Sequence, residues 1–147
     1  MSRGLAIVLV ALAGIFVGMQ APINARLGRQ VGSLQAASVS FLVGTIALLG
    51  VAAISSGGLS GITSAGKAPW WALIGGLLGA FYVTIAILTV RTLGVSGLTA
   101  TVIAAQLATA VVIDRFGLLG VARQELGAPR IIGLVLLLAG VILVVRR

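Results

Sequence analysis

Five apolar runs, separated by short polar segments, constrain the fold of this chain more than any other feature. Because an α-helix rises about 1.5 Å per residue, about 20 apolar residues cross the hydrocarbon core of a bilayer. The expected spans are approximately residues 4–25, 34–54, 69–90, 95–113 and 129–145. Only 8% of the residues are charged, whereas about 25% is usual in a soluble domain. We therefore predict an all-α integral membrane protein, with residues 1–147 forming a single membrane domain of five transmembrane helices.

The first apolar run also resembles a signal peptide, because Arg3 precedes apolar residues 5–17. Residues 18–22, Gly-Met-Gln-Ala-Pro, form a poor cleavage site, and four more apolar runs follow them. We therefore expect an uncleaved first helix. Trp70 and Trp71 begin the third expected span, where aromatic side chains usually anchor a helix at the membrane interface. The alternative is that they stack on a substrate.

Cysteine and histidine are both absent from the chain. Their absence excludes disulfides, thiol chemistry and histidine metal ligation, as well as most catalytic triads. Only short loops lie outside the expected spans, including residues 55–61 (Ser-Ser-Gly-Gly-Leu-Ser-Gly). No segment outside the membrane is large enough to hold an active site. We therefore predict no enzyme activity, no metal site and no cofactor.

The ten lysines and arginines divide evenly between the two sides of the expected topology. Arg3, Lys67, Arg115, Arg123 and Arg130 fall on one side, and Arg26, Arg29, Arg91, Arg146 and Arg147 fall on the other. Positive charge in short loops normally decides which side faces the cytoplasm, so an even division gives the insertion machinery almost no instruction. A chain that inserts both ways can pair with its own inverted copy, and inverted repeats build many transporters. We predict a dual-topology, antiparallel homodimer.

The same charges bear on possible partners. The formal net charge is +8, which could indicate a nucleic-acid partner. However, the basic residues lie singly or in pairs at the ends of apolar runs, where arginine can reach the lipid headgroups. We therefore expect the lipid bilayer as a partner and no nucleic acid.

Polar residues inside the first span are candidate site residues, because polar groups in a membrane need partners. Gln20 and Asn24 are four residues apart and share a helix face. Pro22 has no N–H to donate, so we expect a helix break that frees the Gly18 carbonyl. Together these groups could line a polar cavity. Alternatively, Gln20 and Asn24 hold neighbouring helices together through hydrogen bonds, or Asn24 simply reaches the membrane interface.

The later spans contribute Tyr82, Gln106 and Asp114. Tyr82 needs a hydrogen-bond partner if it is buried, and Gln106 is the most central polar side chain of the fourth span. Asp114 is one of two acids in the chain and could couple a cation or a proton to transport. The competing interpretations are an ion pair with Arg115 or Arg123, or a simple helix-end residue. Serine and threonine hydroxyls are weaker candidates, because they can bond to their own helix.

Glycine is abundant, and pairs such as Gly14 with Gly18, and Gly75 with Gly79, have small-xxx-small spacing. Such pairs let helix backbones approach closely. We expect close packing at these positions, although mobile, cavity-lining helices would have the same spacing.

A set of short motifs is formed by residues 20–29 (QAPINARLGR), 32–33 (GS), 40–44 (SFLVG), 69–71 (PWW), 75–83 (GGLLGAFYV), Gln106 and 114–117 (DRFG). These stretches resemble the YdcZ-type family of small bacterial inner-membrane proteins, within the drug/metabolite transporter superfamily. They occur in order across nearly the whole chain. Ala105 stands where the family pattern suggests glycine. Arg115 stands where histidine is common, which puts a proton-shuttling role at that turn in doubt.

The resemblance implies a five-helix half-transporter in the bacterial cytoplasmic (inner) membrane. Two inverted copies would then make a ten-helix, inverted-repeat transporter. The similar small multidrug resistance proteins carry a glutamate in their first helix, but this chain has no acid there. We therefore do not carry their proton-for-cation mechanism over to it.

The combined prediction is a transporter of a small metabolite or drug-like solute that works by alternating access. Gln20, Asn24, Tyr82 and Gln106 would line the substrate cavity, with Asp114 and Arg115 as coupling or gate residues. One alternative is a non-transporting subunit or assembly partner of a larger membrane complex. Another is a narrow passive channel.

Overall fold

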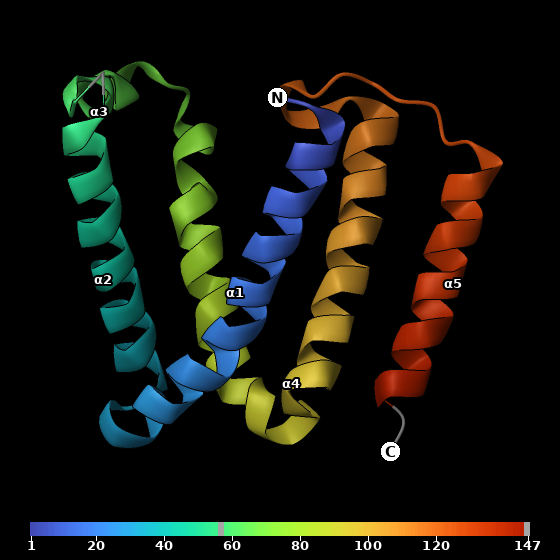
Figure 1. Cartoon of the computed structure of the whole chain (residues 1–147), viewed down its shortest axis with the longest axis horizontal. Coiled ribbons are helices and arrows are strands. Elements are labelled where there is room, and N and C mark those ends of the chain that lie inside the picture. Colours follow the sequence, from blue (N-terminus) through green and yellow to red (C-terminus); the bar gives the residue numbers. More distant parts are fainter. Residues whose placement is uncertain (56–57, 146–147) are drawn as a thin grey trace. The chain divides into compact units, whose positions relative to one another are not determined.

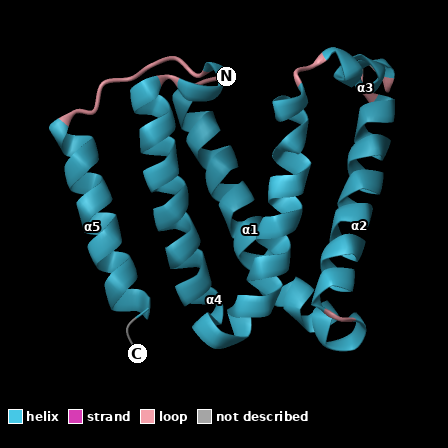
Figure 2. Cartoon of the chain, turned by 180° about the vertical axis from the view of Figure 1, so that it is seen from behind, coloured by secondary structure: helices cyan, strands magenta, loops and turns pink. Residues whose placement is uncertain are grey.

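The computed structural model describes residues 1–55 and 58–145, and these form helices and no strand (Figures 1 and 2). In order, the elements are α1 (Arg3–Val31), α2 (Ser33–Ile54), α3 (Ser60–Thr63), η1 (Ser64–Lys67), η2 (Trp70–Ile74), α4 (Gly75–Phe116), η3 (Leu118–Gly120) and α5 (Ala128–Val145). The chain divides into two compact units, Met1–Thr89 and Val90–Arg147. Part of the expected loop, Ser56 and Gly57, and the C-terminal Arg146 and Arg147 lie outside the described residues.

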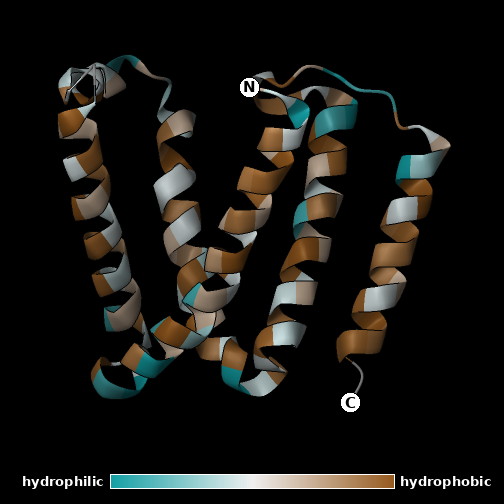
Figure 3. Cartoon of the chain, viewed as in Figure 1, coloured by the Kyte–Doolittle hydropathy of each residue, from teal (hydrophilic) through white to brown (hydrophobic). Residues whose placement is uncertain are grey.

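Within the described residues, four helical stretches are long and apolar enough to cross a membrane: Arg3–Val31, Ser33–Ile54, Trp70–Phe116 and Ala128–Val145. Figure 3 shows that their middle turns are hydrophobic. The chain therefore has the helices of an integral membrane protein.

The third and fourth expected spans fall together in one stretch of 47 residues. Within it, Gly94 alone has a non-helical backbone, with φ 69° and ψ 168°. A positive φ suits glycine, which has no Cβ to clash with the backbone.

In the first unit, α1 and α2 contact each other and run in opposite directions (Figures 1 and 2). Gly32 is the single residue between them, with φ 93°. Its N–H donates to the Gly28 carbonyl at 3.1 Å, and its carbonyl accepts from Ala36 at 2.9 Å. One glycine therefore ends α1, begins α2 and makes the turn.

The expected break in the first helix is a bend within a continuous helix. α1 is helical through Pro22 and extends six residues beyond the predicted end at residue 25, to Val31. Figure 1 shows that its C-terminal part runs obliquely to its N-terminal part. Proline removes one helical hydrogen bond and clashes with the preceding turn, which bends a helix without ending it.

The core of the first unit lies where α1, α2 and α4 come together. Ala36 and Ala37 of α2 pack with Val83 and Ile87 of α4. The partly buried residues Leu27, Phe41 and Tyr82 cover this cluster. A Cβ added to Gly28 of α1 would lie 3.1 Å from Ile87 Cγ2 and 3.7 Å from Ala36 Cβ. Small residues on α1 and α2 therefore let three helix backbones approach closely.

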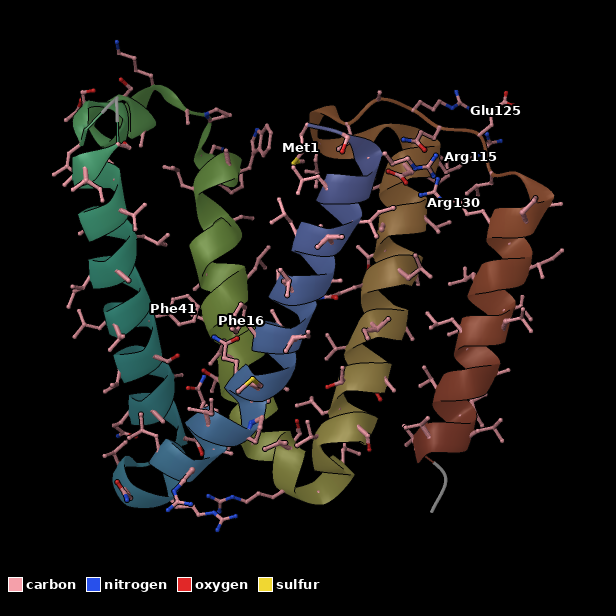
Figure 4. The ribbon with its side chains drawn as sticks, in the orientation of Figure 1. Met1, Phe16, Phe41, Arg115, Glu125 and Arg130 are labelled. Carbon is pink, nitrogen blue, oxygen red and sulfur yellow. The ribbon has the colours of Figure 1, made fainter. Side chains whose placement is uncertain are left out.

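The glycine pairs picked out by spacing are not where this approach occurs. In the described part of the first unit, no neighbouring atom lies within 4 Å of a Cβ added at Gly14, Gly18 or Gly75. Of the four, only Gly79 meets a neighbour, since its added Cβ would lie 3.2 Å from Phe41 Cζ. Figure 4 shows Phe41 on α2. Gly28 has the same spacing with Gly32, but that pair was not among those picked out. The packing partners of Gly28 come from α2 and α4, and spacing along α1 does not identify which glycines meet another helix.

In the second unit, α4 ends at Phe116 and Gly117 follows in the left-handed conformation (φ 63°). Left-handed glycine is a common helix C-terminal cap. Residues 121–127 then lead to α5, in which Pro129 is the second residue. Pro129 thus lies in the first helical turn, where its missing N–H costs no helical hydrogen bond.

We expect Gly28→Val to lower the free energy of unfolding by about 1–3 kcal/mol, because its Cβ would already lie tightly against Ile87 and its two methyl groups would add bulk there. The measurement is thermal or denaturant unfolding of the purified protein in detergent. Gly14→Val is the matched control, since it makes the same substitution in the same helix where a Cβ meets no neighbour in the first unit. Equal destabilisation by the two variants would contradict the close approach at Gly28.

Candidate functional site

A small cavity lies between α1 and α4 in the first unit. Its lining residues are Gln20, Ala21 and Asn24 from α1, with Tyr82, Val83, Ala86 and Ile87 from α4. Its volume of about 10 Å³ is at the lower limit for a single water molecule. The helical period places Gln20 and Asn24 on one face of α1, one turn apart. The structure therefore brings together three of the four predicted cavity residues: Gln20, Asn24 and Tyr82.

Asn24 is the most buried polar residue of this cavity, with 6% of its surface exposed. Its side-chain nitrogen Nδ2 has no hydrogen-bond partner. An unpaired buried donor costs about 1–3 kcal/mol in a protein interior, and a water molecule or a bound solute in the adjoining cavity would relieve that cost. A residue that only held helices together would place this donor on a neighbouring backbone or side chain. An unpaired donor beside a cavity is instead suited to meet a bound molecule.

An open groove of about 450 Å³ adjoins the cavity along α1. It is lined by Phe16, Val17, Met19, Gln20, Ile23 and Asn24. Gln20 and Asn24 thus line both the cavity and the groove. The other groove residues are apolar, so the polar surface is concentrated where cavity and groove meet.

The hydroxyl groups near this site are occupied by their own helices, as the sequence suggested. Thr84 donates to the Ala80 carbonyl at 2.8 Å, and Ser38 donates to the Leu34 carbonyl at 3.0 Å. Thr89 likewise donates to Ile85 at 2.7 Å. These bonds leave the two amides and the tyrosine as the principal polar groups of the cavity.

Gln106, the fourth predicted cavity residue, belongs to the second unit, where it is an exposed residue of α4. Its role in a substrate cavity stays a prediction. The helix-break residues Gly18 and Pro22 lie in the continuous part of α1, half-buried and exposed respectively.

Asp114 forms an ion pair in the second unit, and its partner is Arg130 (Figure 4 labels Arg130). The Arg130 Nη1 also donates to Gln124 Oε1 at 3.3 Å, while the Gln124 backbone N–H donates to the Asp114 carbonyl at 2.8 Å. These bonds connect the end of α4, the 121–127 segment and the first turn of α5. The Asp114 side chain is 18% exposed, so the pair is only partly screened by solvent.

The sequence had suggested Arg115 or Arg123 as the ion-pair partner of Asp114, and Arg130 was missed. Adjacent residues on a helix point in different directions, which disfavours a pair between Asp114 and Arg115. The available signal was Pro129, since it places Arg130 in the first turn of a helix that starts on the side where α4 ends.

Asp114 and Glu125 are the only acids in the sequence, and the described residues hold no group of three metal-ligating side chains.

The basic residues lie toward opposite ends of each unit taken by itself. In the first unit, Arg3 begins α1, whereas Arg26 and Arg29 lie in its last two turns. In the second unit, Arg115 and Arg130 lie at the end of α4 and the start of α5, and Arg91 lies at the other end of that part of α4. Arg146 and Arg147 of the predicted charge balance fall outside the described residues.

Comparisons with known proteins agree with the resemblance found in the sequence. A family model described as "Putative inner membrane exporter, YdcZ" matches residues 5–143. The inner membrane protein YdcZ of Escherichia coli (strain K12) is 30% identical over 150 aligned positions, which cover 100% of this chain and 99% of that protein. No solved structure matches. The chain is therefore a multi-pass protein of the bacterial inner membrane and belongs to the YdcZ family.

Proposed function

We propose that this chain is one half of a transporter that moves a small metabolite or drug-like solute by alternating access. The observation that carries the proposal is the buried Asn24 amide with its unpaired N–H group beside a cavity. In a membrane protein such a group is costly, so its presence supports a binding role. The description of the family as an inner membrane exporter adds support, and it favours export as the direction.

The proposed transporter has five spans in each chain. The stretch Trp70–Phe116 has 47 residues, which as a single helix would be about 70 Å long. The hydrocarbon core is only about 30 Å thick, so we propose that this stretch crosses it twice. Gly94 is the natural place for the turn, because its positive φ interrupts the helix there.

We further propose that two copies assemble as an antiparallel homodimer. The even division of basic residues supports insertion in both orientations. Two inverted copies of one chain form an assembly whose inward-open and outward-open states are nearly equal in energy. Solute binding then needs to supply only a small bias to switch between them.

In this proposal Asp114 and Arg130 form the coupling or gate pair, with Arg115 beside them. Their ion pair connects α4 to α5 across the 121–127 segment. A pair that opens and closes during the cycle is able to couple movement of these helices to transport. The proposal assigns no enzymatic reaction, metal or cofactor to the chain.

Topology is the first test of the dimer. We expect reporters fused after Arg147 to be active on both sides of the membrane at comparable levels. Ser64→Lys adds a basic residue on the side of Arg3 and Lys67, so it should shift the ratio toward one orientation. Ser64→Glu is the matched control and should change the ratio little, because acids contribute little to topology. A single active reporter in the unchanged chain would contradict dual insertion.

Flux measurements test the cavity. We expect Gln20→Leu and Asn24→Leu to lower saturable transport of a solute panel in proteoliposomes by about tenfold, as the loss of one buried hydrogen bond predicts. Gln30→Leu is the matched control, since Gln30 is an exposed glutamine of the same helix. If Gln20→Leu and Asn24→Leu instead unfolded the protein while leaving flux per folded molecule unchanged, these residues would be structural.

The ion pair has its own test. We expect Asp114→Ala and Arg130→Ala each to reduce transport, and the exchanged pair Asp114→Arg with Arg130→Asp to restore part of it. The effect on stability should be small, about 0.5–1 kcal/mol, because the pair is partly exposed. Arg123→Ala, in the same loop region, serves as the control. Full activity in all the single variants would remove the pair from the mechanism.

A further inference from the structure

The polar side chains around the cavity are all uncharged. Gln20, Asn24 and Tyr82 provide them. The first unit contains no acid, because Asp114 and Glu125 are the only acids in the sequence. Its basic residues, Arg3, Arg26, Arg29 and Lys67, are absent from the residues that line the cavity and the groove. No side chain of this site therefore offers a full charge to a bound molecule.

This lack of charge selects against ionic solutes. An ion that leaves water for an apolar site loses several kcal/mol of hydration free energy, and only an opposite charge in good geometry offsets that loss. The unpaired group of Asn24 is an N–H donor, which suits an oxygen acceptor on the bound molecule. An anion would find no cationic side chain to balance its charge, and a cation would find amide and hydroxyl oxygens but no carboxylate.

The shape of the site adds a second constraint. The cavity of about 10 Å³ admits only a small group, whereas the adjoining groove, which residues of α1 alone line, is open and sets no upper limit on size. The groove presents Phe16, Val17, Met19 and Ile23, with Phe16 labelled in Figure 4. Gln20 and Asn24 lie where the two spaces meet.

We infer that the solute is a neutral molecule with an uncharged oxygen acceptor, such as a carbonyl, ether or hydroxyl oxygen, on an apolar body. The Asn24 amide donates a hydrogen bond to that oxygen at the cavity, and the apolar body lies in the groove against Phe16 and Ile23. This inference rests on the proposed transporter function and specifies the class of its solute.

The sequence provides two unique reporters for a binding experiment. Asn24 is the only asparagine and Tyr82 the only tyrosine of the chain. Labelling with ¹⁵N-asparagine therefore yields one side-chain amide signal, and labelling with ¹⁹F-tyrosine yields one fluorine signal, both at the cavity. The full chain is labelled and studied in lipid nanodiscs.

Four small aromatic molecules serve as probes. N,N-diethylbenzamide is neutral and has a carbonyl acceptor, propylbenzene has no acceptor, benzoate is an anion and benzyltrimethylammonium is a cation. We expect N,N-diethylbenzamide to produce a saturable shift of the Asn24 amide and Tyr82 fluorine signals. The two ions should produce none, and propylbenzene should bind about tenfold more weakly, as expected for the loss of one buried hydrogen bond.

Variants separate hydrogen bonding from simple partitioning into lipid. Asn24→Leu should weaken the benzamide-induced shift of the Tyr82 signal about tenfold, and Gln30→Leu should leave it unchanged. Equal shifts with propylbenzene would mean that the groove accepts any apolar chain, lipid tails included, and would overturn the inference. Saturable binding of either ion, or no saturable shift with the benzamide, would also overturn it.

The outcome is distinguishable from failure of the proposed function. Selective benzamide binding at Asn24 without saturable flux of any neutral solute would support the binding site but contradict the proposed transport function. Saturable flux of ionic solutes that depends on Asn24, without benzamide binding, would support the transport function but overturn the inferred solute class.

Discussion

The scarcity of water inside a bilayer is the constraint on which the structure of this protein depends. Each backbone N–H and C=O in the hydrocarbon region needs a partner within the protein, which is why the apolar runs form helices. The threonines near the site obey the same rule, since Thr84 and Thr89 donate to carbonyls one turn earlier. Against this background, the unpaired Asn24 donor is an exception, which the proposed binding role explains.

Close packing of small residues holds the Asn24 side chain in its place beside the cavity. Gly28 and Ala36 let α1 and α2 approach Ile87 of α4. Asn24 lies one turn before Gly28 on the same face of α1, so the contact at Gly28 holds Asn24 near Tyr82 and Val83. In a membrane no hydrophobic effect drives helices together, so their association relies on such close contacts. The same packing that stabilises the first unit therefore forms the wall of its cavity.

In the second unit an ion pair connects neighbouring helices, whereas in the first unit close packing of small residues does so. The Asp114–Arg130 pair and the bonds of Gln124 connect the end of α4 to the start of α5. Asp114 lies in the last turn of α4 and Arg130 in the first turn of α5. Charged groups cost less free energy near a membrane surface than at the bilayer centre, so the ends of apolar helices suit such a pair.

The sequence by itself determined the membrane class, the approximate helix positions, the candidate residues Gln20, Asn24 and Tyr82, and the family. These follow from local properties, namely apolar run length, one-turn spacing and ordered motifs. The tertiary structure alone decided that Gly28, not Gly14 or Gly18, meets a neighbouring helix, and that Asp114 pairs with Arg130, not Arg115. It also decided that the Asn24 nitrogen is buried without a partner. Each of these depends on atoms that another helix contributes, and residue spacing along one helix does not say which side chains of another helix meet it.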